Sequence, residues 1–299
     1  MVKVKVTELI EDAIKKKYAI GYFESWDLES TLAVATAAEK MNSPVLLGFS
    51  GIYLPNPLKV YKNNLKIYAD MVNSIASEIK IPSATVFNES PFYEVVIENI
   101  GYGYNLVMFT DENLVYEDIV KKIKKIVIMA HKKNVEVEGE VSSLPGAGEY
   151  LLNIPDNYRI TDPKVAKKFV EDTGVDLLAV NLGQAHMHGR KKMYLNIKKL
   201  DEIKREVDVP LVLHGMSSIR QEDIKEAIKH GISKVNVSSA MKQIYFETIK
   251  SECIKTGLNY NPYLIVGSGF KEDIITKANI KVQKFVEKTI NVFGSSGKA

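Results

Sequence analysis

The sequence predicts an α/β protein built as a (β/α)8 barrel, or TIM barrel, with an additional helix at each end of the chain. The first observation is an alternation in which eight short apolar or β-branched runs are each followed by a longer segment with helical spacing. The second is that most of these runs lack apolar–polar alternation, which is typical of strands covered on both faces. The third is size, because 299 residues with 45% hydrophobic residues can bury one large core. We expect one domain over residues 1–299.

The predicted strands are short and are separated by crossovers, as parallel strands require. They comprise Ala19–Phe23, Pro44–Phe49, Ala84–Asn88, Leu106–Thr110, Val135–Val141, Leu177–Leu182, Leu211–His214 and Lys234–Val237. Eight such β/α units in one chain are enough to close a barrel. An open doubly wound sheet is the alternative, but that fold usually carries a Gly-rich turn after its first strand. This chain has Glu24, Ser25 and Trp26 there, so the barrel is preferred.

The predicted helices carry recognisable start and stop signals. Between the strands they comprise Leu28–Met41, Leu65–Ile79, Phe92–Ile100, Tyr116–Lys133, Pro163–Thr173, Ile197–Glu206, Gln221–His230 and Met241–Thr256. Asp27 is placed to cap the first of them, and Asp162 with Pro163 forms a cap followed by a first-turn proline. Outside the repeat, Val6–Lys17 and Lys271–Val292 are predicted as the leading and closing helices.

Composition narrows the class of protein. Lys and Arg number 40 and Asp and Glu number 37, so the net charge of +3 gives no support for a nucleic-acid or membrane-surface role. No segment approaches the roughly 18–20 apolar residues of a membrane span, and the start lacks the apolar region of a secretory signal. The single cysteine, Cys253, excludes an intrachain disulfide, and we expect a cytoplasmic protein with a flexible tail at 294–299.

Polar residues gather where the predicted strands end, which in this fold is the face that carries the chemistry. The strand-end residues are Glu24, Ser25, Ser50, Asn88, Glu89, Glu138, Glu140, His186, His188, His214, Asn236 and Ser238. Four of them, His186, His214, Glu140 and Glu89, are nitrogen and oxygen donors able to bind a divalent metal, with His188 as an alternative ligand. Two imidazoles with carboxylates suit Zn2+ with an open position. The alternative is that each is a hydrogen-bonded polar residue at a barrel mouth.

The loops after the last two strands are rich in serine. Gly215 is followed by Ser217 and Ser218, and Asn236 by Ser238 and Ser239. These loops usually bind phosphate in a TIM barrel, through backbone N–H groups and hydroxyls at a helix N-terminus. Plain helix capping by the serines is an equally simple interpretation.

A long segment, 142–158, follows the fifth predicted strand and contains Glu149. Its length on the active face indicates a candidate lid. A surface loop with a solvated Glu149 is the alternative.

Several segments in this order resemble the class II, metal-dependent fructose-bisphosphate/ketose-bisphosphate aldolase family. The strongest are TDPKVAKKFVEDTGVDLLAVNLGQAH, DVPLVLHGMSSI and ISKVNVSS, and the likeness extends over roughly residues 18–240. The resemblance implies a homodimer or homotetramer that acts on a sugar phosphate. It also implies a zinc ion that polarises the ketose carbonyl as a Lewis acid and stabilises the enediolate.

The resemblance also assigns roles to individual residues. His186 and His214 match the family's zinc histidines, and Glu140 its strand-5 acid. Asn236 matches a substrate-contacting asparagine and Glu149 the mobile-loop glutamate. The remaining substrate and phosphate contacts fall on Ser50, Gly183, Gly215, Ser217, Ser218, Ser238 and Ser239.

The departures from the family pattern affect the chemistry. The family carries Asp-His after strand 3, where this chain has Asn88 and Glu89. A carboxylate can replace an imidazole as a metal ligand, but an amide cannot act as a general acid or base. Glu89 or a bound water would then serve the substrate hydroxyl. The phosphate loop reads Gly215-Met216-Ser217-Ser218 instead of Gly-Gly-Ser-Gly, and Ser238 replaces an aspartate.

These observations leave three functional hypotheses. The first is a zinc-dependent lyase that reversibly cleaves a ketose phosphate or bisphosphate to dihydroxyacetone phosphate and an aldehyde. The second is a divergent member with a different sugar-phosphate reaction, an isomerase or another carbon–carbon lyase, motivated by Asn88, Met216 and Ser238. The third is a barrel that binds a sugar or a metal without reacting.

Overall fold

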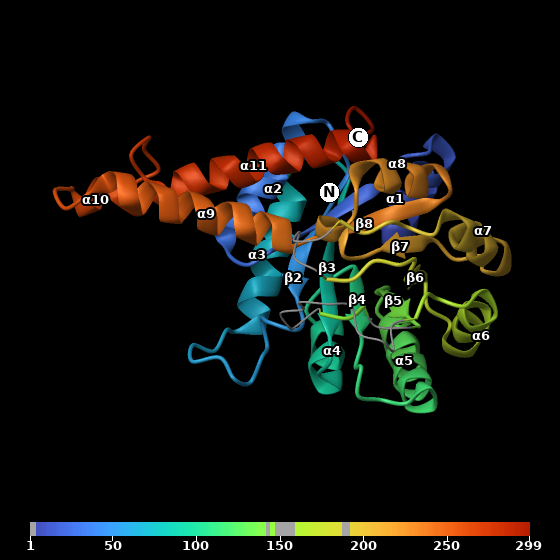
Figure 1. Cartoon of the computed structure of the whole chain (residues 1–299). Helices are drawn as coiled ribbons and strands as arrows, with labels where there is room; N and C mark the ends of the chain where they lie inside the picture. The colour runs from blue at the N-terminus through green and yellow to red at the C-terminus, as the bar shows by residue number, and fades with distance from the viewer. Residues whose placement is uncertain (1–3, 142–143, 147–158, 187–191) are drawn as a thin grey trace.

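A computed structural model of the chain describes residues 4–141, 144–146, 159–186 and 192–299. Within these residues, eight parallel strands form a closed barrel in which each strand pairs with the next and β8 pairs with β1 (Figure 1). The strands are β1 (Ile20–Ser25), β2 (Val45–Ser50), β3 (Ser83–Ser90), β4 (Leu106–Phe109), β5 (Glu136–Glu140), β6 (Leu177–Ala179), β7 (Leu211–Leu213) and β8 (Ile232–Val237). The predicted (β/α)8 barrel is confirmed.

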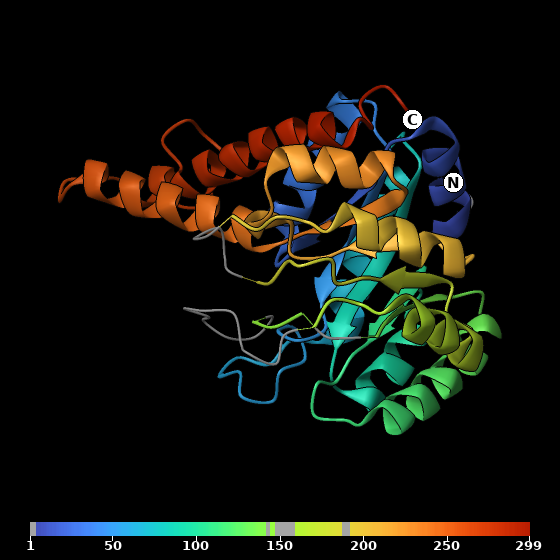
Figure 2. The ribbon, with the colours of Figure 1, turned by 45° about the vertical axis from the view of Figure 1, so that its right-hand side comes forward.

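The helices follow the strands as predicted. They are α1 (Val6–Lys16), α2 (Leu28–Lys40), α3 (Leu65–Glu78), α4 (Tyr93–Ile100), α5 (Tyr116–His131), α6 (Pro163–Thr173), α7 (Ile197–Glu206), α8 (Gln221–Lys229), α9 (Ser239–Thr256), α10 (Pro262–Ile265) and α11 (Ile274–Phe293). A 3-10 turn, η1 (Met216–Ser218), follows β7. Figure 2 shows α9 and α11 running side by side and extending beyond the barrel, with α10 at their tip in Figure 1.

The capping signals act as the sequence indicates. The Asp27 side chain accepts a hydrogen bond from the Ser30 backbone N–H at 2.8 Å, and Ser30 Oγ accepts one from the Asp27 N–H in return. The Asp162 side chain caps α6 by accepting from the N–H groups of Lys164 and Val165, and Gly174 ends that helix in the left-handed region at φ 74°.

Two clusters of buried apolar side chains stabilise the barrel. The larger one lies between the strands and the surrounding helices. The second fills the barrel interior and includes Val6, Leu9 and Ile10 of α1 packed with strand residues such as Leu46 and Val212. The Glu136 carboxylate accepts hydrogen bonds from the first backbone N–H groups of α1, at Val6 and Thr7. This helix therefore covers the end of the barrel opposite the carboxyl ends of the strands.

The C-terminal tail makes defined contacts where the sequence predicts flexibility. The backbone N–H groups of Gly297 and Ala299 donate to the carbonyl oxygens of Met41 and Asn42 at 2.9 and 3.0 Å. Ser295 is fully buried and its hydroxyl accepts a hydrogen bond from Ser43. The tail continues past α11 along the end of α2, where these partners are available.

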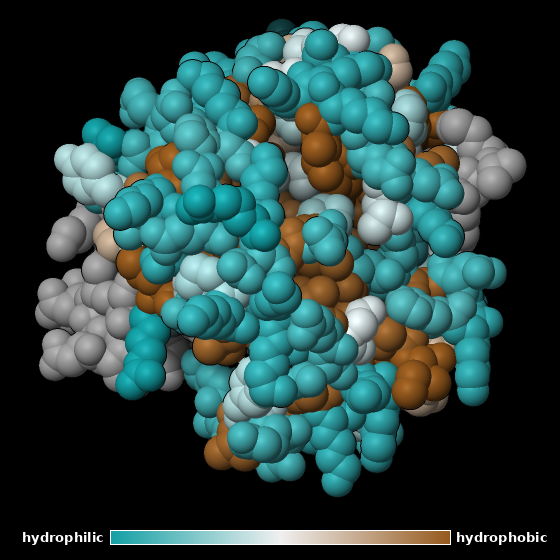
Figure 3. Space-filling model, turned by 90° about the vertical axis from the view of Figure 1, so that its right-hand side faces the viewer, coloured by the Kyte–Doolittle hydropathy of each residue, from teal (hydrophilic) through white to brown (hydrophobic). Residues whose placement is uncertain are grey.

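The surface on the α6–α7 side is largely hydrophilic, with apolar side chains in short strips between polar ones (Figure 3). Among the helices within the described ranges, none is long and apolar enough to cross a membrane.

Candidate active site

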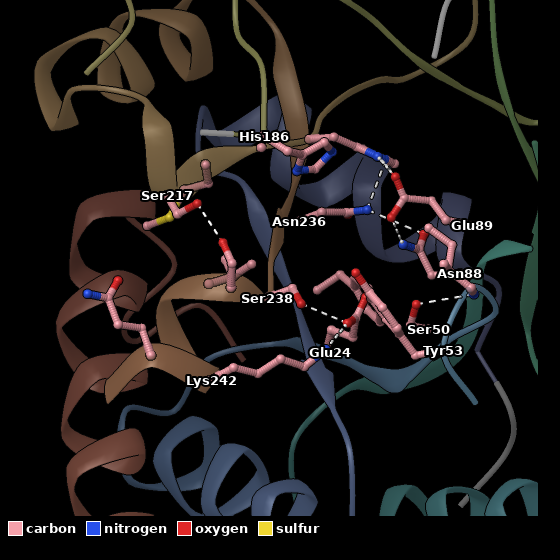
Figure 4. A pocket seen from close by; sticks show the side chains of 18 residues that line it. Glu24, Ser50, Tyr53, Asn88, Glu89, His186, Ser217, Asn236, Ser238 and Lys242 are labelled. Atoms are coloured by element: carbon pink, nitrogen blue, oxygen red, sulfur yellow. Dashed lines mark hydrogen bonds and ion pairs between the residues drawn. The ribbon is translucent and has the colours of Figure 1, made fainter. Parts of the chain in front are cut away.

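One cavity of about 670 Å3 opens at the carboxyl ends of the strands (Figure 4). It brings together most residues that the sequence placed at the strand ends. Its lining comprises Tyr22, Glu24, Ser50, Ile52, Tyr53, Asn88, Glu89, His186, His214, Gly215, Met216, Ser217, Asn236, Val237, Ser238, Ser239, Lys242 and Gln243. These residues come from strands on both sides of the barrel, so closure of the barrel is what assembles the site.

His214 is held between two carboxylates. Its Nδ1 lies 2.9 Å from Glu89 Oε1 and its Nε2 lies 2.7 Å from Glu138 Oε1. Burial opposes the charged ring, but the two carboxylates outweigh burial and raise the pKa of His214 to about 10. The ring is therefore an imidazolium at neutral pH in this arrangement.

A buried lysine continues this network into the barrel. Lys234 of β8 donates to Glu138 Oε2 at 2.7 Å and to Asn236 Oδ1 at 2.6 Å. Both Lys234 and Glu138 have fully buried side chains. Burial lowers the pKa of Lys234, whereas Glu138 counteracts that shift. Burial raises the pKa of Glu138, but Lys234 and His214 outweigh it and lower that pKa overall.

Asn88 and Glu89 occupy an irregular end of β3. Glu89 has a positive φ of 48°, and the β3–β4 register shifts between Phe87 and Ser90. The Asn88 amide donates to Glu89 Oε2 at 2.9 Å and accepts a weaker bond from Asn236 at 3.3 Å. Both oxygens of Glu89 are thus engaged, and the turn directs its carboxylate toward His214.

Glu89 is a strongly acidic group. Burial raises its pKa, but the charge and hydrogen bond of His214, with contributions from His186 and Lys234, outweigh burial and hold the pKa at about 2. A carboxylate with this pKa is a weak proton acceptor near neutral pH.

Glu140 is not part of the hydrogen-bond network that joins His214 to Glu89, Glu138 and Lys234. Its Oε2 accepts a hydrogen bond from Thr110 at 3.3 Å. Burial, reinforced by Glu89 and Glu138, raises the pKa of Glu140 to about 8 despite the nearby charge of His214. The strand-5 carboxylate in contact with His214 is Glu138, which the sequence placed at the strand end without assigning it to the site.

The cavity contains donor atoms with the right chemistry for a metal ion. Glu89, His186 and His214 line one cavity, yet the described part of the chain has no group of three or more His, Cys, Asp or Glu side chains placed to hold an ion. His214 contacts carboxylates at both ring nitrogens, and Glu140 accepts a hydrogen bond from Thr110. The four-residue metal centre stays a prediction.

The loops after β7 and β8 meet at one end of the cavity. Gly215, at φ 70°, turns the chain into η1, and the hydroxyls of Ser217 and Ser239 lie 2.7 Å apart. Met216 adopts an ordinary helical backbone and packs into the core, so replacing a family glycine at this position introduces no backbone strain. Ser238 precedes α9, but its side chain does not cap the helix. The N–H groups of Met241 and Lys242 donate to the Ser238 carbonyl oxygen instead.

Four further residues that the sequence assigned to the site do not line the cavity or lie outside the described residues. Gly183, at φ 114°, allows close approach of the Tyr194 carbonyl oxygen and does not line the cavity. Ser218 is fully buried and does not line the cavity either. Glu149 and His188 lie outside the described residues.

Sequence reasoning missed Lys234, Lys242, Tyr22 and Tyr53. A signal for Lys234 was available, because a lysine inside an apolar strand requires a buried partner. The Tyr22 hydroxyl is buried and has no hydrogen-bond partner among the described residues.

A closed parallel barrel with its polar residues at the carboxyl ends of the strands defines the class of TIM-barrel proteins that carry chemistry at this face. The family model described as fructose-bisphosphate aldolase class-II matches residues 4–298. The chain belongs to this family of lyases, whose members generally depend on a metal.

Individual relatives are similar over nearly their whole length. A fructose-bisphosphate aldolase of Geobacillus stearothermophilus is 31% identical over 298 residues, covering 99% of this chain and 98% of that protein. The uncharacterized protein YdjI of Escherichia coli K12 is 30% identical over 288 residues, covering 96% of each.

Solved structures agree with this result. The crystal structure of the YdjI aldolase from Escherichia coli K12 superposes with a TM-score of 0.80 at 28% identity and covers 100% of both chains. A putative fructose-1,6-biphosphate aldolase from Coccidioides immitis gives a TM-score of 0.82 at 20% identity, covers 98% of this chain and 97% of that one, and supports the fold.

Proposed function

We propose that the protein reversibly cleaves a ketose phosphate to dihydroxyacetone phosphate and an aldehyde. The observation that carries the proposal is the single cavity in which His214, Asn236, Ser50 and the loop serines face one another. Membership of the class II family and the names of its relatives support the same reaction.

The reaction breaks the bond between C3 and C4 of the ketose. The C4 hydroxyl loses its proton as this carbon becomes the aldehyde, and the bonding electron pair moves to C3 and is delocalised into the C2 carbonyl. A proton added at C3 then completes dihydroxyacetone phosphate. The amide of Asn236, which lines the cavity, is suited to stabilise the negative charge that develops on the substrate oxygen.

The proton of the C4 hydroxyl needs an acceptor other than Asn88. Glu89 stands beside Asn88, but its pKa of about 2 makes it a weak base. We therefore propose that Glu89 orients a water that takes the proton. The family resemblance implies that Glu149 transfers the C3 proton, and that assignment stays a prediction.

The phosphate is proposed to bind where β7 and β8 end. Gly215, Ser217 and Ser239 line this part of the cavity, and the Ser238 side chain does not cap α9. Backbone N–H groups and hydroxyls at a helix N-terminus are favourable for an anion.

Zinc remains our proposal for the metal. The family generally requires a metal. The imidazoles of His186 and His214 and the carboxylate of Glu89, which line one cavity, are ligand types that zinc accepts. Binding would require His214 to lose its proton and exchange its contact with Glu89 for the ion. Glu140 and His188 stay as further predicted ligands. Metal analysis of the purified protein tests this point, with one ion per chain as the expected result.

A different sugar-phosphate reaction is the second candidate, favoured by the amide at Asn88. This reaction would be an isomerisation or another carbon–carbon cleavage, and Met216 and Ser238 motivate it as well. Detection of an isomerised ketose phosphate without aldehyde release would favour it.

We also propose a homodimer or homotetramer in the cytoplasm. The hairpin of α9, α10 and α11 extends from the barrel and exposes apolar side chains, namely Phe246, Ile254, Leu258, Tyr260, Tyr263, Val266 and Phe270. An exposed apolar surface of this kind indicates an association site. Sedimentation velocity tests the assembly, and a monomer would contradict it.

The main experiment measures aldehyde and dihydroxyacetone phosphate released from a panel of ketose phosphates, with and without added divalent metals. Cleavage of at least one ketose phosphate is expected. Replacement of His214 by Ala should lower kcat/KM by at least about 100-fold, since the ring joins Glu89 to Glu138 and is a proposed zinc ligand. The control His131→Ala changes an exposed histidine paired with Asp176, outside the cavity, and should leave the rate unchanged. No product from any substrate would refute the proposal.

A further inference from the structure

Six polar side chains form a closed ring of hydrogen bonds that connects the cavity with the barrel interior. In order around the ring they are Lys234, Glu138, His214, Glu89, Asn88 and Asn236, and Asn236 contacts Lys234 again. We call these six residues the Lys234 ring. Lys234 and Glu138 do not line the cavity, whereas the other four members do.

The two ends of one side of the ring fix the direction of its hydrogen bonds. The Lys234 ammonium has only donors, and it donates to Asn236 Oδ1 at 2.6 Å. The Glu89 carboxylate has only acceptors, and Asn88 donates to its Oε2 at 2.9 Å. The nitrogen of the Asn236 amide therefore donates to Asn88 Oδ1, at 3.3 Å (Figure 4). Reversing either amide would place two donors or two acceptors against each other.

One hydrogen of the Asn236 amide has no acceptor in the ring. Nδ2 carries two hydrogens, and Asn88 accepts one of them. Nδ2 also lies 2.9 Å from His214 Nε2, but the Glu138 carboxylate beside that nitrogen can only accept, so Nε2 carries a hydrogen and offers no lone pair. In the described part of the chain, Nδ2 has no further hydrogen-bond partner. Because Asn236 lines the cavity, its second hydrogen is available to an acceptor oxygen of a bound molecule.

Lys234 holds the amide in this orientation. Lys234 and Asn236 are two residues apart on β8, so their side chains lie on the same face of the strand. The fully buried ammonium is itself fixed by Glu138 at 2.7 Å. Without this cation the Asn236 amide could turn over and accept the hydrogen of His214 Nε2, which would place an oxygen where the N–H groups had been.

We infer that Lys234 is a positioning residue, which fixes the Asn236 amide as a hydrogen-bond donor to the substrate oxygen that becomes negative during cleavage. This inference rests on the proposed aldol function and adds a residue that acts from outside the cavity. It limits Asn236 to donating to an acceptor such as a carbonyl oxygen, since Lys234 engages the amide oxygen.

A double-mutant cycle separates positioning from general structural support, because a residue that acts through Asn236 loses its effect once that side chain is removed. The probe is dihydroxyacetone phosphate, which carries the carbonyl oxygen, and isothermal titration with Zn2+ present gives its Kd. Asn236→Ala should weaken binding about tenfold in the wild-type protein. In the Lys234→Met protein the same change should weaken binding less than about twofold.

Two further substitutions make the cycle specific. Ser217→Ala is the matched control, because Ser217 lines the same cavity but its hydroxyl contacts Ser239 instead of Lys234. Its effect on the Kd should be the same factor with and without Lys234. Asn236→Asp keeps an acceptor for Lys234 but has no donor, and it should weaken binding at least as much as Asn236→Ala.

Lys234→Met leaves Glu138 without its cation, so the cycle is repeated with Glu138→Gln in every protein, which removes the unpaired charge. Circular dichroism identifies a variant that does not fold. Asn236→Asp, which leaves Lys234 in place, decides where Lys234→Met folds in neither background.

Four results would overturn the inference. They are an equal effect of Asn236→Ala with and without Lys234, an effect of Ser217→Ala that shrinks as much as that of Asn236→Ala, wild-type affinity of Asn236→Asp, and no binding of the probe. The proposed function is judged separately by aldehyde release. The expected cycle without cleavage would retain the positioning role and refute the aldolase, and cleavage with an additive cycle would do the reverse.

Discussion

Lys234 and Glu138 form a fully buried ion pair, with 2.7 Å between Nζ and Oε2, in the interior of the barrel next to His214. The second oxygen of Glu138 contacts the His214 ring, so the pair orients the imidazole from inside the barrel. On its other side the ring meets Glu89 at 2.9 Å. Lys234, Glu138, His214 and Glu89 thus form a chain of alternating positive and negative side chains whose charges balance.

Loss of Lys234 should destabilise the protein strongly. Lys234→Met leaves Glu138 buried beside a single cation, and breaking a buried pair by removing one partner costs about 3–5 kcal/mol. Urea unfolding measures this change. The control Lys168→Met removes an exposed pair with Asp172 and should cost less than about 1 kcal/mol. A Lys234 variant as stable as the control would show that the buried pair is not structurally important.

Asn88→Asp should destabilise the protein at neutral pH by about 1–3 kcal/mol, because it replaces a donor to Glu89 by a second carboxylate. The neighbouring charge should raise the folded-state pKa of the new carboxyl. The folded state then binds a proton more readily than the unfolded state, so stability relative to wild type should recover as the pH falls.

Unfolding in urea at about pH 7 and about pH 5 tests this dependence. Asn113→Asp is the matched control, because Asn113 donates to Asp111 in the same way at the exposed surface. An equal and pH-independent effect of both substitutions would contradict the prediction.

Asp273 should contribute to acid stability. Its carboxylate caps α11 by accepting from the N–H groups of Ile275 and Thr276, and it also accepts from Gly269. Burial raises its pKa, but these three hydrogen bonds outweigh burial and lower the pKa below 3.8. A lowered folded-state pKa gives stability that is present above the unfolded value and is lost as pH falls through the folded value.

Asp273→Ala should therefore cost about 0.5–2 kcal/mol at neutral pH, with the difference from wild type shrinking below about pH 4. Thermal unfolding across this range measures it. Asp70→Ala, which removes an exposed ion pair, is the comparison and should have a small effect. A cost for Asp273→Ala that persists unchanged in acid would argue against capping by the ionised carboxylate.

The serines at the proposed phosphate site should act mainly on substrate binding. Ser217→Ala and Ser239→Ala each remove a hydroxyl able to donate to a charged group, an interaction worth about 1.5–3 kcal/mol. The KM for the ketose phosphate should rise about tenfold or more with little change in kcat. The control Ser77→Ala changes an exposed serine of α3. A fall in kcat with constant KM would place these hydroxyls at the reacting carbons instead.

The barrel could be predicted from the sequence because its periodic signals are local. The helices Pro163–Thr173 and Ile197–Glu206 have the bounds that their capping residues and spacing indicate. The site was harder to predict. Strand β5 carries a glutamate at every second position, at 136, 138 and 140, and this pattern does not say how far inside the barrel each side chain lies. That depth follows from the register, in which Glu138 lies opposite Met108 and Leu177. Side-chain pairing across the barrel, as between Glu138 and Lys234, has no sequence signal beyond the need of each charge for a partner.

The packing of α1 against the barrel interior has a consequence for kinetics. With that end covered, both products of the proposed cleavage would depart through the same opening by which the substrate arrives. If one product is held farther from that opening, it would leave second. Product inhibition should accordingly show a fixed sequence of release, with one product competitive against the intact sugar and the other not.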